Sequence, residues 1–408
     1  MKVAYCKYGD VVDELERLGP EPSLVPGGGP DHYIASFLSR VAGAQVRLVS
    51  YGGRGSRTTR GTASAVTLVG DSNVDGVVSS VFRGWLAFVR VGWEMLRFRP
   101  DGILCAMSGP GLWAAALTAR WTGASLVCTR HASLELKSVS WVHKLRRTWN
   151  GAALKSADWV LCHGPYLEAE LRAMGVDATR ILQFNLSYKY VTEIPGDPAS
   201  EMPSERQEKA RVLFVGRLET EKGVFDLLQA IAPILKETDV ELIYAGTGRA
   251  LTRLKECATQ LPGGQSRVKF LGHLGVDQLV RELRQATVVV TPTQSRYSES
   301  RCKAAIESLV SGTPVVAPAF GPFPYVVSHG INGLLYEPNS VASLNAALKR
   351  ILSDPSLRGR LEAGALSAAH TLVTPDRTFD DALARTVFGR PGTGAGPAKT
   401  LRPQLGRQ

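Results

Sequence analysis

The chain has 408 residues, of which 44% are hydrophobic and 21% are charged, and its formal net charge is +11. This length exceeds one ordinary hydrophobic core and predicts two domains of roughly 180 residues each. The composition excludes a disordered chain, and no apolar run approaches the roughly 20 residues that span a bilayer. The six cysteines show neither a CxxC pair nor metal-ligand spacing, which indicates a reducing cytoplasm without disulfides or structural zinc.

The positive charge is concentrated in three segments, 83–99, 130–155 and 390–408. The first two also carry aromatic residues, among them Trp93 and Trp149. Basic helices with tryptophan suit the surface of an anionic membrane, although the same pattern is typical of amphipathic helices that bury their aromatic residues and expose a basic face. No nucleic-acid-binding motif is present, and we do not expect nucleic acid as a partner.

In chain order, the N-terminal half alternates predicted strands and helices, which favours a parallel α/β sheet. Strands are expected at residues 3–8, 45–51, 63–69, 103–107, 125–130 and 180–186. Helices are expected at 33–42, 82–97, 112–123 and 141–157. The segment GGRGSRTTRG, which separates the second and third strands, is expected to be a basic polar loop.

Three positions in this half are candidates for ligand contact. The cluster PGGGP contains Gly28 and Gly29 before the first long helix, where glycine lets a ligand approach the backbone closely, although a plain flexible loop fits as well. Arg130 and His131 lie at the carboxyl end of a predicted buried strand, which is where ligands bind in such sheets. His163 occupies a similar position and is a weaker candidate, because a lone histidine is usually an ordinary loop residue.

A segment rich in Pro, Glu and Ser at 194–209 predicts a linker between domains 1–193 and 210–370. The second domain opens with the strand RVLFVGR, after which Arg217 and Lys222 lie in a loop with glycines on either side. An arginine with forked hydrogen bonds and a lysine as a point charge suit a diphosphate, although a salt-bridged surface loop is the alternative. Glycines also follow the next strand, at positions that face the same edge of the sheet: Gly246 and Gly248.

The stretch 288–318 contains a βαβ pattern, with a helix expected from about Ser300 to Val310. Glu299 at the start of that helix and Glu307 are expected on one side of it, about 12 Å apart along the axis. This separation is too long for two carboxylates that act on one bond, and it suits the two ends of one ligand. Because a helix N-terminus binds anions, a diphosphate with a sugar at each end fits the arrangement; a helix-capping charge and a solvated face residue are the alternative.

These motifs resemble the retaining, two-domain GT-B glycosyltransferases of group 1, family 4. Three segments carry the resemblance in the expected order: LFVGRLETEKGVFDLLQA at 213–230, the Glu299-x7-Glu307 pair followed by SGTPVVAP, and INGLLYEPNSVASLNAAL at 331–348. The resemblance implies two Rossmann-like parallel-sheet domains that face each other across a cleft. It also implies that a helix at 371–390 crosses back to the first domain; the Gly, Pro and basic residues at 391–408 indicate a disordered tail.

The resemblance further implies a nucleoside-diphosphate sugar, UDP- or GDP-linked, as the donor substrate, with no cofactor and no bound metal. The matching positions imply that Glu307 holds ribose hydroxyls and that Glu299 holds hydroxyls of the transferred sugar. Arg217 and Lys222 would bind the diphosphate, and His131 would lie at the floor of the cleft. The remaining donor-binding positions are Gly216, Gly246, Gly248, Ser300, Arg301, Cys302 and Lys303, and the acceptor or diphosphate loop comprises Gly28, Gly29 and Arg130.

One departure from the family concerns the three residues after Glu299. The family often has Gly-Phe-Gly there, whereas this chain has Ser300, Arg301 and Cys302. The change removes a glycine at which the donor would approach the backbone, while Arg301 or Lys303 can supply positive charge. The pose of the donor is therefore expected to differ from the family pattern, whereas the two glutamates keep their positions.

The resulting hypothesis is retaining transfer of a sugar to a glycan or lipid-linked acceptor, in cell-surface polysaccharide or glycolipid synthesis, by a cytoplasmic enzyme peripheral at the inner face of the membrane. The acceptor would attack on the face that the diphosphate leaves, and a phosphate oxygen would take its proton. A GT-B sugar-nucleotide epimerase and a non-catalytic sugar-nucleotide-binding subunit are the alternatives. The intact set of Glu299, Glu307, Arg217 and Lys222 favours an enzyme.

Overall fold

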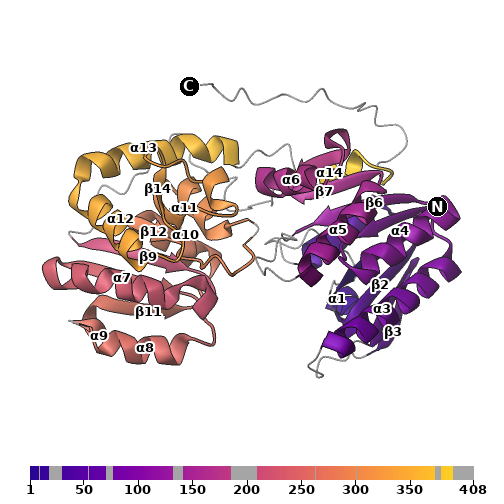
Figure 1. Cartoon of the computed structure of the whole chain (residues 1–408), viewed down its shortest axis with the longest axis horizontal. Coiled ribbons are helices and arrows are strands. Elements are labelled where there is room, and N and C mark those ends of the chain that lie inside the picture. Colours follow the sequence, from indigo (N-terminus) through magenta and orange to yellow (C-terminus); the bar gives the residue numbers. More distant parts are fainter. Residues whose placement is uncertain are drawn as a thin grey trace.

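The computed structural model describes residues 1–8, 10–17, 30–53, 55–69, 77–131, 141–184, 209–261, 263–299, 301–372 and 378–388. Within these ranges the chain forms two α/β domains, each built on its own sheet (Figure 1). Several predicted features lie outside the described residues: Gly28, Gly29, Ser300, all but the last residue of the linker 194–209, and the tail 391–408.

The first domain contains an eight-stranded sheet in the order β3-β4-β2-β1-β5-β6-β7-β8. Its strands are β1 (Lys2–Tyr8), β2 (Gln45–Gly53), β3 (Ser56–Arg60), β4 (Ala63–Val69), β5 (Gly102–Cys105), β6 (Ser125–Arg130), β7 (Trp159–His163) and β8 (Ile181–Phe184). All neighbouring pairs are parallel except β3 with β4. Alternate residues of β1 enter two different cores, with Ala4 and Cys6 on one face and Val3 and Tyr5 on the other, as expected for a strand buried on both sides.

The expectation of a loop throughout the segment between β2 and β4 is wrong, because β3 pairs with β4 as an antiparallel edge strand. A tight turn at Gly61 and Thr62 closes this hairpin, and Gly61 has a positive φ of 58°. The strand carries Arg57, and charged residues of this kind protect a sheet edge from pairing with another chain. The sequence signal for a strand was weak because the segment is polar and has no hydrophobic alternation.

Two helical layers cover the first sheet. One layer consists of α3 (Val77–Phe98), α4 (Pro110–Thr122), α5 (Trp141–Lys155) and α6 (Gly164–Ala173). The other layer consists of α1 (Val11–Arg17), α2 (Pro30–Arg40) and, from the far end of the chain, α14 (Phe379–Ala384). A short 3₁₀ helix, η1 (Ala178–Arg180), precedes β8.

Helix α14 packs on the first domain, where Figure 1 shows it in yellow among the purple elements. The Asp380 carboxylate accepts a hydrogen bond from the Ser36 hydroxyl, and the Phe37 and Phe388 rings pack edge to face with centroids 5.4 Å apart. A reciprocal pair of hydrogen bonds between Thr378 and Asp381 caps the helix. This capping box fixes the start of the helix at Phe379, within the range 371–390 that the resemblance implied.

The second domain contains a six-stranded, fully parallel sheet in the order β11-β10-β9-β12-β13-β14. Its strands are β9 (Ala210–Val215), β10 (Val240–Ala245), β11 (Val268–Gly272), β12 (Val288–Val290), β13 (Val315–Pro318) and β14 (Gly333–Tyr336). The direction of strand progression reverses between β9 and β12. In an open α/β sheet, the carboxyl ends of the strands at such a reversal are the preferred place for a ligand.

Helices cover both faces of this sheet. On one face α7 (Val224–Glu237), α8 (Leu251–Thr259), α12 (Val341–Ser353) and the start of α13 (Pro355–Leu372) form the main core. On the other face lie α10 (Val276–Gln285) and α11 (Lys303–Val310). The remaining short helices are α9 (Gly264–Arg267), η2 (Thr220–Lys222) and η3 (Phe323–Tyr325).

The helix expected from about Ser300 begins three residues later, at Lys303. Cys302 precedes it in a left-handed conformation with φ 45°, and only 3% of its surface is exposed because it packs into the core with Ala305 and Leu309. This buried anchor interrupts the helical geometry before Lys303. Glu299 therefore lies on the preceding loop, and the expectation that both glutamates lie along one helix is wrong.

The backbone at the end of β10 leaves no room for a side chain at Gly246. Its φ is +143°, and a Cβ atom there would lie 1.8 Å from the Gly216 carbonyl oxygen. We expect Gly246→Ala to lower the free energy of unfolding by about 2–4 kcal/mol, measured by urea denaturation. Gly275→Ala is the control, because a Cβ atom at Gly275 meets nothing within 4 Å. Equal destabilisation by both variants would contradict this account of Gly246.

Candidate functional site

The carboxyl ends of β9 and β10 border a cavity of about 260 Å3 in the second domain. Gly216, Arg217 and Gly246, all candidates from the sequence, contribute to its wall. Gly248 lies just beyond, where a Cβ atom would meet the Leu218 carbonyl oxygen at 2.3 Å. The full lining consists of Val215, Gly216, Arg217, Ala245, Gly246, Thr247, His273, Leu274 and Leu279.

Beside this cavity, the structure brings together three of the four residues predicted to be catalytic. The Lys222 ammonium lies 2.5 Å from the Glu299 carboxylate and 4.1 Å from the centre of the Tyr297 ring. The Tyr297 hydroxyl accepts a hydrogen bond of 2.7 Å from Arg217, whose guanidinium also lies 3.3 Å from Glu219. One tyrosine thus connects the two cations. Arg217 thus lines the cavity and also pairs with Glu219, as in the salt-bridged surface loop that was the alternative expectation.

Hydrogen bonds hold the loop that carries Glu299 against the rest of the second domain. The Gln294 backbone amide donates to the Glu221 carbonyl at 2.9 Å, and its side-chain amide donates to Asp226 at 2.8 Å. The Glu299 carboxylate accepts from the Cys302 backbone N–H at 3.3 Å. The carboxylate of Glu299 and the ammonium of Lys222 are therefore positioned before any ligand arrives, at 15% and 17% side-chain exposure.

Glu307 lies on α11 with its carboxyl group buried. Burial raises the pKa of this carboxyl from 4.5 to about 8. The Lys303 ammonium, one helical turn away, lies 3.4 Å from Oε1 but is half exposed, and among the described residues no group donates a hydrogen bond to Oε1. A buried acceptor without a donor is costly unless a ligand supplies one, so the carboxylate is suited to bind hydroxyl groups. Neither Glu307 nor Glu299 lines the cavity beside Gly216.

His131 lies in the first domain, in a chain of polar contacts that reaches the second domain. The Arg301 guanidinium lies in hydrogen-bond contact with His163 Nδ1. His163 Nε2 lies 3.0 Å from both the Tyr33 hydroxyl and His131 Nδ1, and His131 Nε2 lies 3.0 Å from the Thr129 hydroxyl. Burial lowers the pKa of His131 to about 3 and that of His163 well below its ordinary value, so both rings are neutral.

The neutral state of the two rings determines their tautomers. Because arginine only donates, His163 Nδ1 accepts and its proton lies on Nε2. That proton points to Tyr33 and to His131 Nδ1, which leaves the His131 proton on Nε2, directed at Thr129. Arg301 thus contacts His163 of the histidine pair in the first domain, and its contact with the donor stays a prediction.

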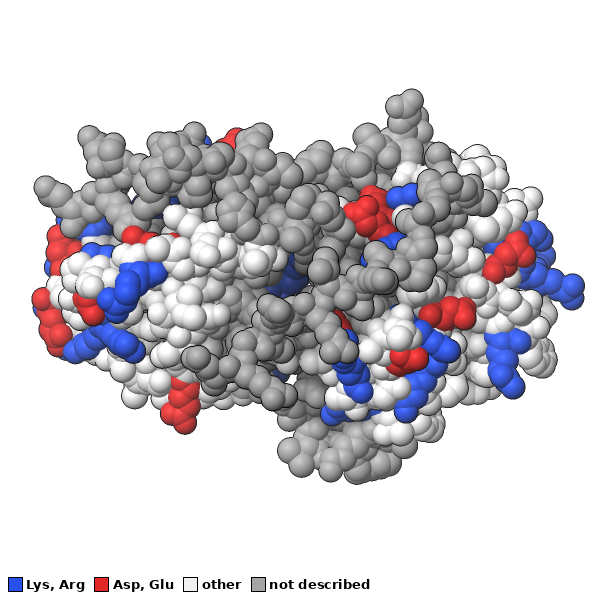
Figure 2. All heavy atoms as spheres, turned by 90° about the horizontal axis from the view of Figure 1, so that it is seen from above, with Lys and Arg blue, Asp and Glu red and all other residues white. Residues whose placement is uncertain are grey.

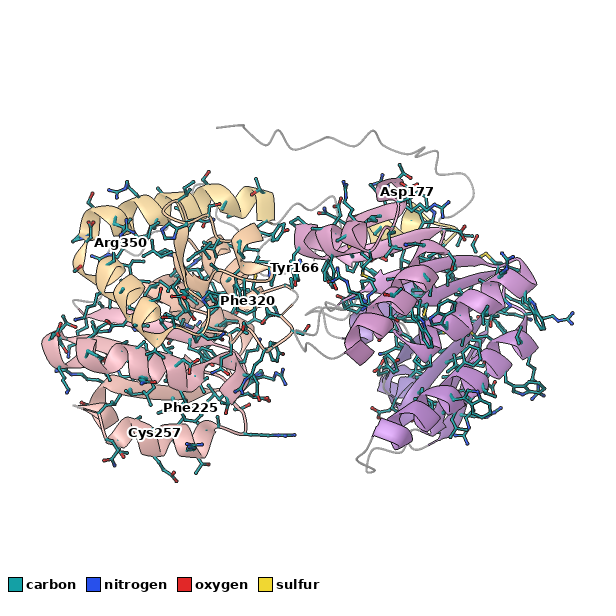
Figure 3. All side chains as sticks on the ribbon, in the orientation of Figure 1. Tyr166, Asp177, Phe225, Cys257, Phe320 and Arg350 are labelled. Carbon is teal, nitrogen blue, oxygen red and sulfur yellow. The ribbon has the colours of Figure 1, made fainter. Side chains whose placement is uncertain are left out.

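A second contact between the domains lies near the first. The rings of Tyr166, at the start of α6, and Tyr325, in η3, have centroids 5.8 Å apart. Figure 3 shows Tyr166 on the side of the first domain that faces the second. The Arg130 side chain is buried inside the first domain and donates to the Met107 carbonyl at 3.4 Å.

Sequence reasoning missed two tyrosines in these clusters. Tyr297 lies two residues before Glu299, and Tyr33 begins the helical pattern after the glycine cluster. Neither position carried a signal beyond its distance in sequence from a candidate residue. In the described part of the chain, no group of three or more His, Cys, Asp or Glu side chains is arranged to hold a metal ion. Nor is any helix of that part both long enough and apolar enough to cross a membrane.

Two family models match the chain. The model "Glycosyl transferase 4-like domain" matches residues 28–185, and the model "Glycosyl transferases group 1" matches residues 199–367. A D-inositol 3-phosphate glycosyltransferase of Mycolicibacterium gilvum is 31% identical over 286 residues, 65% of this chain and 62% of that protein. An uncharacterized glycosyltransferase of Methanocaldococcus jannaschii is 33% identical over 153 residues, 38% of each chain. The matched regions thus span less than two thirds of the curated relatives.

Solved structures share the fold over nearly the whole chain. The lipopolysaccharide outer core galactosyltransferase WaaB aligns with a TM-score of 0.62 and 18% identity, covering 94% of this chain and 98% of WaaB. Sucrose-phosphate synthase of Thermosynechococcus elongatus aligns with a TM-score of 0.61 and 20% identity, covering 91% and 94%. Anabaena HepE in complex with UDP aligns with a TM-score of 0.57 and 16% identity, covering 91% and 95%. These matches confirm the predicted GT-B fold.

Proposed function

Because the chain belongs to the group 1 glycosyltransferases, we propose that it transfers a sugar from a nucleoside-diphosphate sugar to an acceptor with retention of configuration. The observation that carries this proposal is the buried Glu307 carboxyl oxygen to which no described residue donates, on the helix that follows the loop of Glu299, which pairs with Lys222. A ribose supplies vicinal hydroxyl donors for such an oxygen. Structures of the related fold hold UDP and UDP-glucose, which supports a UDP-sugar as the donor here, with a GDP-sugar as the second choice.

The proposed roles of the second-domain residues follow from their charges. Lys222 and Arg217 hold the diphosphate and offset the negative charge that grows on it as the sugar leaves. Glu299 accepts hydrogen bonds from hydroxyls of the transferred sugar, and its contact with Lys222 keeps its carboxylate in place. In the retaining reaction the acceptor attacks on the face that the diphosphate leaves, and a phosphate oxygen takes the acceptor proton. Positioning and electrostatic stabilisation then account for most of the rate.

The acceptor side is proposed to involve the neutral histidines. When a sugar hydroxyl replaces the Thr129 hydroxyl, the Nε2–H of a neutral His131 can donate to it without placing a positive charge beside the acceptor. The acceptor we propose is a glycan or a lipid-linked sugar used in cell-surface polysaccharide or glycolipid synthesis, in the cytoplasm at the inner face of the membrane. Curated relatives are named as glycosyltransferases of D-inositol 3-phosphate and as glycogen synthase, which supports acceptors rich in hydroxyl groups.

A thermal-shift panel with UDP, GDP, ADP and dTDP tests the donor part of this proposal. A nucleotide at about 100 times its dissociation constant adds roughly 2.7 kcal/mol of stability, which shifts the melting temperature by several degrees. We expect a shift with UDP or GDP and none with the other two. The absence of a shift with every nucleotide, at millimolar concentrations and with the protein folded, would contradict the proposed donor.

A further inference from the structure

The outer face of α3, α4 and α5 exposes large apolar side chains. Among the described residues, all four tryptophans that are more than half exposed lie on these three helices: Trp85 (60%), Trp93 (66%), Trp121 (84%) and Trp149 (58%). Val89 and Leu117 add to them, at 42% and 46%. Tryptophan normally buries most of its large surface, so this many exposed rings on one layer of one domain indicate a contact surface.

The spacing of these residues places them on common stripes. Trp85, Val89 and Trp93 are four residues apart and follow one side of α3 over about 12 Å. Leu117 and Trp121 are also four residues apart and share one side of α4. The two helices lie close together, because a Cβ atom at Gly92 would be 3.8 Å from the Ala114 Cβ. Their opposite sides, with Val91, Met95 and Ala115, are buried on the sheet. The exposed rings are therefore not members of the core.

Charge accompanies the apolar residues on this layer. The sequences of α3, α4 and α5 contain eight Arg or Lys residues and one acidic residue, Glu94. Glu94 is 5% exposed and pairs with Arg57 and Arg47, so it does not offset the surface charge. Arg97 continues the stripe of α3, Arg120 lies beside Trp121, and both are exposed. Figure 2 shows basic side chains at the outer end of the first domain.

We propose that this face, defined by Trp85, Trp93, Trp121, Trp149, Arg97 and Arg120, docks on a lipid membrane that contains anionic headgroups. Indole rings favour the boundary between water and lipid, where their apolar body is buried and their N–H stays hydrated. Arginines next to them are attracted to the negative surface potential of an anionic leaflet. Rings spread over three neighbouring helices suit a broad, fluid surface. A second copy of the chain would have to place one basic face against another, which is unfavourable.

This inference goes beyond the proposed sugar transfer, because it concerns only the first domain and involves none of the donor-site residues. It has a consequence for the acceptor: a membrane-docked first domain meets acceptors that are anchored in lipid. The docking surface and the donor site are separable, and each can fail in an experiment without the other.

Co-sedimentation of the full chain with vesicles tests the proposal. The vesicles contain phosphatidylcholine alone or phosphatidylcholine mixed with phosphatidylglycerol, and each variant is first shown to melt like the wild type. We expect binding to the anionic vesicles only, with release at about 0.5 M salt, where screening is strong. Arg97→Glu with Arg120→Glu, and separately Trp93→Ala with Trp121→Ala, should each weaken binding about tenfold or more.

The matched control reverses two exposed charges on the second domain, Lys236→Glu with Arg360→Glu, and should bind as the wild type does. Unchanged binding by the tryptophan variant would overturn the proposal. Vesicle binding would then rest on charge attraction alone, which an acidic protein could supply as well as a membrane. Failure of the wild type to bind anionic vesicles would overturn it too. So would a dimer in sedimentation velocity that the tryptophan variant loses, because the face would then cover a second copy. The thermal shift with UDP should be the same in all variants.

Discussion

Replacing Lys222 by Met is expected to lower kcat for sugar transfer by about 10²–10³. The Lys222 side chain is 17% exposed, and its ammonium contacts the Glu299 carboxylate and lies over the Tyr297 ring, so this cation is positioned and partly desolvated. A fixed cation of this kind stabilises charge that develops on a leaving diphosphate more than it stabilises the bound donor. The loss should therefore appear in kcat, with a smaller change in KM.

The measurement is release of nucleoside diphosphate from the donor that the thermal-shift panel identifies, with and without acceptor. Methionine keeps the length of the side chain and removes the charge. Lys236→Met changes an exposed lysine of the same domain and serves as the control. Activity within about threefold of wild type in Lys222→Met would show that this lysine does not stabilise the transition state. A rise in KM alone would assign it to ground-state binding.

Replacing Glu307 by Gln is expected to weaken nucleotide binding about ten- to a hundredfold while it stabilises the free protein at alkaline pH. The first effect arises because ribose hydroxyls donate to Glu307 as a carboxylate, after the carboxyl proton is released to solvent on binding, and hydrogen bonds to a carboxylate are stronger than those to an amide. The second arises from burial, which raises the pKa of the Glu307 carboxyl from 4.5 to about 8. Weaker nucleotide binding together with higher stability of the free protein distinguishes a ligand-binding role of Glu307 from a structural one.

The sign of the pH effect follows from linkage. Between pH 4.5 and about 8 the folded protein holds a proton on Glu307 that the unfolded chain has released. The free energy of unfolding therefore falls as pH rises through this window, by at most about 1.4 kcal/mol per pH unit from this group. Below pH 4.5 the carboxyl is neutral in both states, and its contribution does not change. Glutamine does not titrate, so the difference between the variant and the wild type should grow from pH 5 to pH 8.

Urea denaturation at pH 5 and pH 8 measures this difference, and isothermal titration with the nucleotide measures affinity. Glu256→Gln, an exposed carboxylate on α8, should change neither quantity. If Glu307→Gln keeps the wild-type affinity, the ribose role is wrong. If its stability follows the same pH dependence as the wild type, the carboxyl is ionised in the folded protein and the Lys303 ammonium at 3.4 Å compensates it.

The contact between Arg301 and His163 bears on the departure from the family pattern. The family often has glycine near this position, whereas here a long cation reaches the first domain and contacts a buried neutral ring. The interaction joins the loop of Glu299 to the histidine pair through one side chain. Binding of a diphosphate near Arg301 would compete with His163 for the same guanidinium, and the position of the two domains would then depend on the donor.

Much of the fold was predictable from local patterns. The runs of β-branched and apolar residues in β9, β12 and β13 mark strands buried on both faces, and such strands are typical of parallel sheets covered by helices. The glycines and the Arg217 and Lys222 pair marked the carboxyl edge of the second sheet, because turn glycines and ligand-binding cations occupy loops. The polar strand β3 was missed because an edge strand that faces water has no hydrophobic pattern to detect.

The same distinction between local patterns and long-range packing applies to the candidate site. Sequence alone determined the two-domain parallel α/β class, the carboxyl-edge loops of the second sheet and the residue types that suit a sugar diphosphate, because spacing and composition are local properties. Only the tertiary structure decided that Lys222 pairs with Glu299 across 77 residues and that Tyr297 lies between the two cations. It also decided that Arg301 turns to His163 and that four tryptophans remain exposed. Contacts between distant segments depend on how whole elements pack, and no short-range pattern records that packing.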